Sequence, residues 1–127
     1  MRIVLAEDVP AMRNTLADSL CDHGYEVVEV KDGLCLLTEM DSAFAESGAH
    51  AFVDLVITDV QMPGLTGLEV LEALRDSYWD TPVIIISAFA DDDLRKQAIM
   101  LGAEAVLSKP FGMKELLEAV RNAAPVV

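Results

Sequence analysis

Basic residues are scarce in this sequence. Nine Lys and Arg residues stand against 22 Asp and Glu residues, which gives the 127-residue chain a formal charge of −13. A polyanion of this kind is repelled by nucleic-acid phosphates and by anionic lipid headgroups. We therefore expect no direct binding of this chain to nucleic acid or to a membrane surface.

Cysteines and long apolar runs are also few. Cys21 and Cys35 form neither a metal-ligand spacing nor a disulfide framework, so we interpret them as free thiols on helices in a reducing compartment. The longest apolar stretch, around Val83–Ile86 and Ala88–Ala90, is far shorter than the roughly 20 residues of a membrane span. The first residues show no basic and then apolar signal region. The sequence therefore predicts a cytoplasmic protein.

Five short, β-branched runs alternate with helical patterns. Unbroken apolar runs indicate strands that are buried on both faces, and their alternation with helices indicates parallel β-α-β units with right-handed crossovers. We predict an α/β fold with a doubly wound five-stranded parallel sheet, flavodoxin-like (βα)5. Its strand order, 2-1-3-4-5, is taken from known folds of this type. The expected strands are Ile3–Ala6, Val27–Val30, Leu55–Ile57, Val83–Ile86 and Ala105–Leu107.

Proline and glycine mark the ends of the predicted helices. Pro10 opens the first helix, while Gly24 and Gly102 close the first and the fourth. His23, just before Gly24, suits a role at the helix C-terminus. The connection from Lys31 to Asp54 is the longest, which predicts a longer second helix followed by a loose loop.

Polar side chains stand at the carboxyl ends of four predicted strands. In a parallel sheet these ends meet at one edge, where ligands bind. We therefore expect a cluster of three carboxylates, one hydroxyl and one ammonium. Each of these residues alone could equally be a solvated turn residue or a helix cap. The residues are Glu7-Asp8, Asp59, Ser87 and Ser108-Lys109-Pro110.

This set of side chains suits phosphoryl chemistry. Three carboxylates repel one another unless a cation intervenes, and oxygen ligands of this kind suit Mg²⁺. Lys109 and Ser87 could bind phosphoryl oxygens, and Asp59 could attack phosphorus to give an aspartyl phosphate. Catalysis would then consist of positioning and charge neutralisation of an in-line transfer.

The sequence resembles the receiver domains of two-component response regulators, including chemotaxis receivers. The resemblance covers essentially the whole chain, so residues 1–127 are expected to form one receiver domain. It is carried by the acidic pair after IVLA, by ITDVQMPGLTGLEVL (57–71), by PVIIISAFA (82–90) and by GAEAVLSKPF (102–111).

The resemblance implies a role for each matching position. Asp59 matches the phosphorylated aspartate, and Mg²⁺ would be held by Asp8, Asp59 and the backbone carbonyl of Gln61, with Glu7 acting largely through water. Ser87 and Lys109 match the residues that bind the phosphoryl group. The remaining matches shape nearby backbone: Met62, Pro63 and Gly64 beside the phosphosite, Gly67 near the start of the third helix, and Pro110 after a cis peptide bond.

Three features differ from the family pattern or modify it. The family commonly has Tyr or Phe three residues before the lysine, but here this position is Val106, which cannot make the inward swing of an aromatic ring. The segment around the second helix is long and is either inert or a partner surface. Phe89, two residues after Ser87, is expected to slow the hydrolysis of the acyl phosphate.

The sequence thus favours a phosphoacceptor switch rather than an enzyme, catalysing only its own phosphorylation and dephosphorylation. A histidine kinase or phosphotransfer protein would phosphorylate Asp59 with Mg²⁺ and shift the face of helix four, strand five and helix five. The output would pass to a downstream protein or an attached domain, and homodimerisation stays open. We interpret Ile99 and Met100 as half-buried residues, with a partner or dimer surface as the alternative.

Other functions fit less well. A pseudo-receiver, which binds partners without phosphorylation, remains the main alternative because of Val106. An aspartate-nucleophile phosphatase would need an acid at Gln61, whose amide cannot protonate a leaving group. A flavodoxin would need a glycine-rich phosphate cradle where Glu7-Asp8-Val9-Pro10 stands.

Overall fold

The computed structural model, which describes residues 1–47, 53–77 and 80–124, contains a five-stranded parallel sheet in the order β2-β1-β3-β4-β5. This confirms the predicted fold class and strand order. The elements are β1 (Arg2–Ala6), α1 (Pro10–Asp22), β2 (Glu26–Val30), α2 (Gly33–Ser47), β3 (Leu55–Asp59), α3 (Gly67–Asp76), β4 (Val83–Ser87), α4 (Asp92–Met100), β5 (Ala105–Ser108) and α5 (Met113–Ala123).

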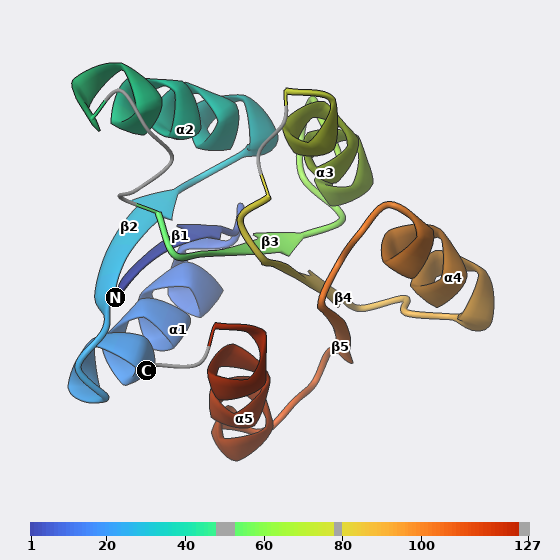
Figure 1. Cartoon of the computed structure of the whole chain (residues 1–127). Coiled ribbons are helices and arrows are strands. Elements are labelled where there is room, and N and C mark those ends of the chain that lie inside the picture. Colours follow the sequence, from blue (N-terminus) through green and yellow to red (C-terminus); the bar gives the residue numbers. More distant parts are fainter. Residues whose placement is uncertain (48–52, 78–79, 125–127) are drawn as a thin grey trace.

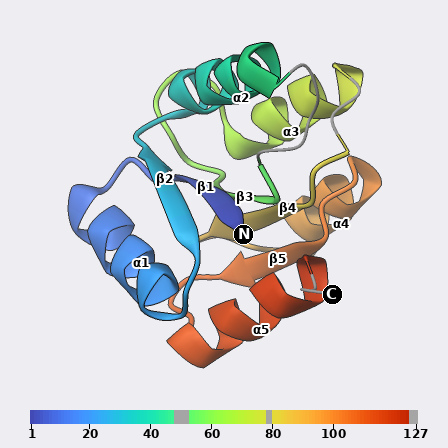
Figure 2. The same ribbon diagram turned by 60° about the vertical axis from the view of Figure 1, so that its left-hand side comes forward.

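Helices cover both faces of the sheet. Figures 1 and 2 show α1 and α5 on one face and α2, α3 and α4 on the other. Neighbouring residues of one strand face opposite layers: Ile3 and Leu5 pack with α1 and α5, whereas Val4 and Ala6 pack with the helices of the other face. The central strands β3 and β4 are buried on both faces and are almost entirely apolar in sequence, whereas the edge strand β2 (EVVEV) is partly exposed.

The strands continue past their apolar runs to polar residues. Asp59 is the last residue of β3 and pairs with Ile86, and Ser87 is the last residue of β4 and pairs with Ser108. Both Asp59 and Ser87 are buried. The regular ladder therefore holds these polar side chains in fixed positions at the carboxyl edge.

The first and fourth helices begin or end close to the proline and glycine residues that the sequence marked. Pro10 is the first residue of α1, and His23 forms its C-cap, with Nδ1 lying 2.8 Å from the carbonyl oxygen of Ser19. Gly24 and Gly102 have φ values of 89° and 98°, which side chains rarely adopt. Cys21 and Cys35 are free, as predicted.

The second helix is the longest of the five, with 15 residues, as its long connection predicts. The loop expected after it lies largely outside the described residues. Among the helices of the described ranges, none combines the length and the apolar character that crossing a bilayer requires.

The interpretation of Ile99 and Met100 as half-buried is wrong. Their relative exposures are 56% and 86%, and Ala98 is the one buried residue of α4. The helix lies over the end of the sheet formed by β4 and the edge strand β5 (Figure 1), where Ala98 joins the apolar cluster that contains Val83 and Val106. Helical periodicity located the inward stripe of α4 but not its width.

Gly67 allows α3 to start against the end of β3. A Cβ atom at this position would lie 2.4 Å from the carbonyl oxygen of Asp59 and 3.0 Å from Cα of Val60. The N–H of Gly67 donates to the carbonyl of Val60, and Thr66 and Glu69 form a capping box over the same turn. The helix start and the backbone of Asp59 are thus packed without room for a side chain.

We predict that Gly67→Ala lowers the free energy of unfolding by about 3 kcal/mol, because overpacking against backbone outweighs the gain of about 1 kcal/mol in helix propensity. Urea denaturation measures the change. Gly112→Ala is the control, since a Cβ there meets nothing within 4 Å, and its loss should stay below about 1 kcal/mol. Equal losses in the two variants would contradict the packing account.

Candidate functional site

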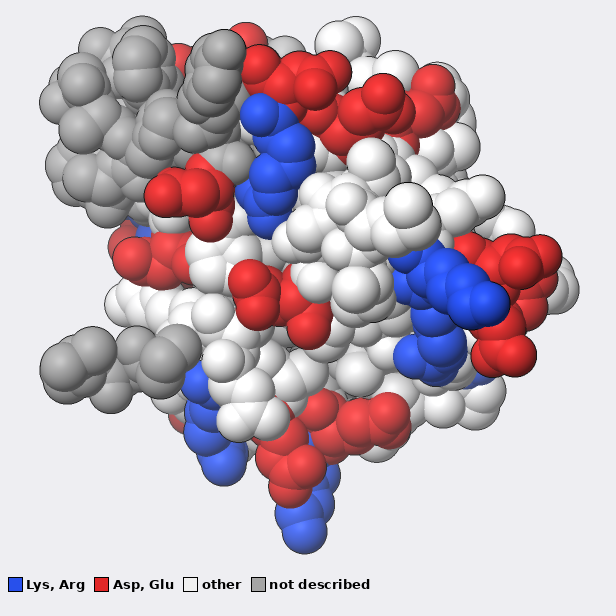
Figure 3. All heavy atoms as spheres, turned by 45° about the vertical axis from the view of Figure 1, so that its right-hand side comes forward, with Lys and Arg blue, Asp and Glu red and all other residues white. Residues whose placement is uncertain are grey.

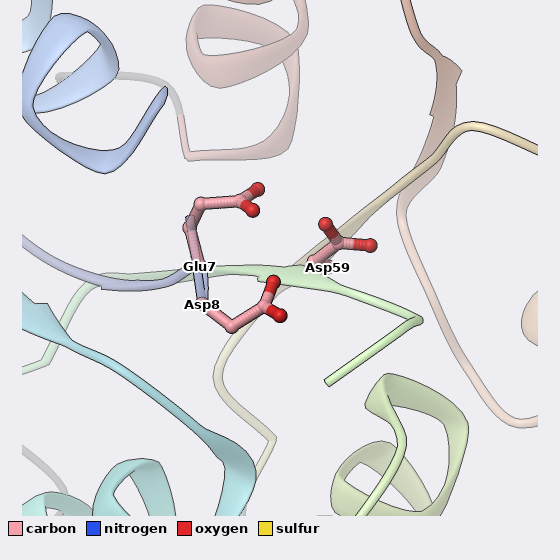
Figure 4. Close-up of side chains that lie close together, drawn as sticks. All are labelled: Glu7, Asp8 and Asp59. Atoms are coloured by element: carbon pink, nitrogen blue, oxygen red, sulfur yellow. The ribbon is translucent and has the colours of Figure 1, made fainter. Parts of the chain in front are cut away.

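Three carboxylates converge at the carboxyl edge of the sheet. Glu7 and Asp8 follow β1, and Asp59 ends β3, which lies beside β1 with Ala6 paired to Thr58. One oxygen atom from each carboxylate lies within 4.8 Å of the others. Figure 4 shows the three side chains pointing toward a common space. The predicted convergence of these residues is therefore present in the structure.

The carboxylates differ in burial. Glu7 and Asp59 are buried, with relative exposures of 0% and 4%, and Asp8 is the least buried of the three. An isolated buried carboxylate is costly unless a cation or hydrogen bonds compensate its charge. The site therefore needs positive charge close to Glu7 and Asp59.

Lys109 supplies that charge from the end of β5. Its Nζ lies 3.0 Å from Oε2 of Glu7 and 2.5 Å from Oδ2 of Asp59. One ammonium thus donates to both buried carboxylates and joins the ends of β1, β3 and β5. With Asp8 included, these four groups have a formal net charge of −2 when all three carboxylates are ionised.

The titration behaviour of the cluster reflects mainly the burial of its groups. Burial raises the pKa of Glu7 to about 7, although the hydrogen bond from Lys109 opposes the shift and the charge of Asp59 adds to it. Burial works to lower the pKa of Lys109, but its hydrogen bonds to Asp59 and Glu7 outweigh this effect and raise the pKa overall. Lys109 therefore stays protonated and only partly compensates the carboxylates.

The loop after β3 fixes the other oxygen of Asp59. The N–H of Gln61 donates to Oδ1 of Asp59 at 3.0 Å, while Lys109 holds Oδ2. Met62 is buried next to the hydroxyl of Thr58, and Gly64 has a positive φ of 80° that turns the loop. Both carboxylate oxygens of Asp59 are thus oriented by this chain's own groups.

Ser87 and Phe89 lie at the end of β4. The hydroxyl oxygen of Ser87 accepts a hydrogen bond from the N–H of Phe89 at 3.0 Å, and the Ser87 carbonyl accepts one from the N–H of Lys109 at 2.8 Å. The Phe89 side chain is 69% exposed. The backbone of β4 is therefore tied directly to the residue that neutralises Asp59.

The remaining predicted residues are Pro110, Pro63 and Val106. The Lys109–Pro110 peptide bond is cis, as the resemblance implies, and Pro63 is exposed on the loop beside Met62. Val106 lies in the middle of β5, where its side chain joins the apolar layer under α4 instead of the carboxylate cluster.

Sequence reasoning missed Arg13. Its Nη1 donates to the carbonyl oxygen of Glu7 at 2.8 Å, and its Nε lies 3.9 Å from a carboxylate oxygen of Glu29 at the end of β2. The guanidinium therefore holds the backbone of the acidic pair. The only available signal was a basic residue one turn into a helix, which is too common to single out.

The donor set fits a hard divalent cation. All three clustered side chains offer carboxylate oxygens, the net charge of the four groups is negative, and Glu7 and Asp59 share one ammonium. These properties match the ligand preference of Mg²⁺.

The three carboxylates and Lys109 account for only −2 of the total formal charge of −13. Figure 3 shows other acidic side chains in several separate groups over one face.

Residues 3–121 match the family model described as the response regulator receiver domain. The chain is 36% identical over 121 residues to the response regulator MprA of Mycobacterium leprae, covering 95% of this chain and 50% of that protein. It is 33% identical to the C4-dicarboxylate transport transcriptional regulatory protein DctD of Pseudomonas aeruginosa, covering 98% of this chain and 25% of that protein.

Solved structures show the same likeness. The chemotaxis protein CheY4 of Vibrio cholerae superposes with a TM-score of 0.83 at 27% identity, covering 96% of this chain and 97% of that one. A response regulator receiver domain protein from Clostridium thermocellum gives a TM-score of 0.81 at 28% identity, covering 97% and 93%.

The chain spans a quarter to a half of the length of these two curated relatives. The match to the family model nonetheless runs through all five strands, and the fold and the carboxylate cluster agree with it. The chain belongs to the family of response regulator receiver domains, the regulatory domains of two-component systems.

Proposed function

We propose that this chain is a phosphoacceptor switch in which Asp59 receives a phosphoryl group from a histidine kinase or phosphotransfer protein. The observation that carries the proposal is the setting of Asp59. Its carboxylate is buried, both of its oxygens are oriented by hydrogen bonds, and two further carboxylates lie beside it. A nucleophile held in this way needs little reorganisation before an in-line attack.

The transfer balances as a substitution at phosphorus. A carboxylate oxygen of Asp59 forms the new O–P bond as the P–N bond to the donor imidazole breaks, and the imidazole leaves with the electron pair of that bond. Mg²⁺, held by Asp8, Asp59 and the Gln61 carbonyl with Glu7 acting through water, would supply positive charge against the phosphoryl oxygens. Gln61 also orients Asp59 through its own N–H.

Lys109 and Ser87 respond to the new charge. The ammonium, which lies 2.5 Å from Oδ2 of Asp59 before transfer, pairs with a phosphoryl oxygen afterwards. The hydroxyl of Ser87 accepts from the Phe89 N–H and still carries a proton that it can donate to another phosphoryl oxygen. The movement of Ser87 breaks its contact with Phe89 and shifts the start of the loop toward α4.

The shift reaches the face formed by α4, β5 and α5. Ile99 and Met100 are exposed on α4, so we propose that they belong to the surface that contacts a downstream protein, an attached output domain or a second copy of the chain. Catalysis is limited to phosphorylation and dephosphorylation of Asp59 itself, and the cytoplasm is the proposed compartment. The slowing of hydrolysis by Phe89 stays a prediction.

A pseudo-receiver is the second candidate. It is favoured by one observation, the short apolar side chain of Val106 where the family pattern has an aromatic ring. A pseudo-receiver would keep the fold and the partner surface without phosphoryl transfer, so direct phosphorylation separates the two candidates.

We predict that the wild-type protein gains the mass of one phosphoryl group when it is incubated with acetyl phosphate and Mg²⁺, and that Asp59→Asn gains none. The amide cannot form an acyl phosphate, while its similar shape preserves the site. Intact-mass spectrometry measures the gain, and omission of Mg²⁺ should reduce it strongly. A wild type that stays unmodified, while a known receiver is phosphorylated in parallel, would favour the pseudo-receiver.

We predict that Asp8→Asn abolishes stabilisation by Mg²⁺. A wild-type protein at a Mg²⁺ concentration ten times the dissociation constant should gain about 1.4 kcal/mol in its free energy of unfolding. Without the metal, the variant should be at least as stable as the wild type, because one of three repelling carboxylates has been removed.

Urea denaturation with and without Mg²⁺ measures both effects. Asp92→Asn is the matched control, because it removes an exposed carboxylate in the first turn of α4, outside the cluster. Its response to Mg²⁺ should equal that of the wild type. An Asp8→Asn protein with the full Mg²⁺ response would show that the ion binds elsewhere.

A further inference from the structure

Arg95 of α4 makes two contacts that the proposed function does not use. Its Nη1 donates to the carbonyl oxygen of Val106 at 2.9 Å, and its Nη2 donates to the hydroxyl oxygen of Ser108 at 2.7 Å. A planar guanidinium with two donors directed at two acceptors constrains distance and orientation together. One side chain therefore connects α4 to the middle and to the end of β5.

This connection ends next to the carboxylate cluster. Ser108 directly precedes Lys109, whose ammonium pairs with Glu7 and Asp59. Ser108 is also the register partner of Ser87, and the N–H of Lys109 donates to the Ser87 carbonyl. A displacement of the Ser87 or Lys109 backbone therefore moves the residue that Arg95 holds.

The helix α4 buries few apolar side chains, so the two hydrogen bonds of Arg95 stand out among its contacts with the sheet. Ala98 is the one buried residue of this nine-residue helix, whereas α3 buries four residues and α5 buries three. Because few apolar contacts fix the position of α4 on the sheet, a small displacement transmitted through Arg95 can reorient this helix.

The exposed apolar residues of α4 lie on the same part of the helix. Ile99 is one turn after Arg95, and Arg95, Lys96, Ile99 and Met100 line one shallow depression on the surface. A rotation or translation of α4 that follows Arg95 changes how Ile99 and Met100 are presented.

We propose that Arg95 is a positioning residue that couples the Ser87 and Lys109 end of the phosphorylation site to α4. The proposal rests on the proposed function, because the displacement begins when a phosphoryl group attracts Ser87 and Lys109. Arg95 acts through Ser108 and the backbone of β5 and does not touch the reacting atoms. It transmits the change and leaves the transfer itself unaffected.

The test compares ¹H–¹⁵N spectra of the wild type, Arg95→Ala, Arg95→Lys and Lys96→Ala, with and without beryllofluoride and Mg²⁺. Beryllofluoride takes the place of a phosphoryl group on an aspartate carboxylate. Lys96→Ala is the matched control, because it removes the neighbouring exposed cation of the same helix. Signals of the Gln61 and Lys109 amides report on the site, and signals of the Ala98 and Met100 amides report on α4.

In the wild type and in Lys96→Ala, both sets of signals should shift. In Arg95→Ala the site signals should shift fully, while the shifts of the α4 signals fall to less than half. Arg95→Lys should be intermediate, because lysine restores the charge and one contact but not the paired geometry. Ser108→Ala, which removes one acceptor and keeps Arg95, should also give a partial loss.

Full α4 shifts in Arg95→Ala would overturn the coupling role and leave the proposed function intact. Site shifts in the wild type without any α4 shift would overturn the coupling role and the proposed movement of the α4 face, while phosphorylation of Asp59 would still stand. A wild type in which the site signals do not respond, while a known receiver responds in parallel, would instead overturn the proposed function and the coupling with it.

Discussion

The pairing of one ammonium with two buried carboxylates is the interaction on which the rest of this structure depends. Lys109 lies between Glu7 and Asp59, and it belongs to a strand end two positions away from β3 in the sheet. Without this cation, two carboxylates with almost no solvent exposure would face each other uncompensated. The ends of β1, β3 and β5 must therefore stay in register, and the parallel ladder keeps them there.

The same interaction would make the domain sensitive to a bound cation and to a phosphoryl group on Asp59. In the proposed function, the net negative charge of the four groups would attract a divalent cation, and the oxygens of a phosphoryl group would compete for Lys109. Ser87 and Lys109 are joined through the β4 and β5 backbone, and Arg95 extends that connection to the weakly buried α4. In the proposed coupling, a change in the groups that pair with Lys109 is thus transmitted through β5 and Arg95 to the exposed surface of α4.

The sequence predicted the sheet and the carboxylate cluster because both follow from strong patterns. Strands buried on both faces read as unbroken apolar runs, and parallel strand ends must meet at one edge. The roles of Arg13 and Arg95 could not be predicted, since each binds backbone carbonyls that carry no sequence signature. The exposure of Ile99 and Met100 was missed because periodicity gives the direction of a helix face but not how far its neighbours extend.

A crystal structure of the beryllofluoride complex with Mg²⁺ tests the central claim most directly, because it shows which groups the Lys109 ammonium contacts once Asp59 carries a phosphoryl-like group. We expect Nζ of Lys109 and Oγ of Ser87 each to lie within hydrogen-bond distance of a fluoride. We also expect the Ser87 hydroxyl no longer to accept a hydrogen bond from the Phe89 N–H. A complex in which Lys109 still bridges Glu7 and Asp59, with the Ser87–Phe89 contact unchanged, would contradict the account.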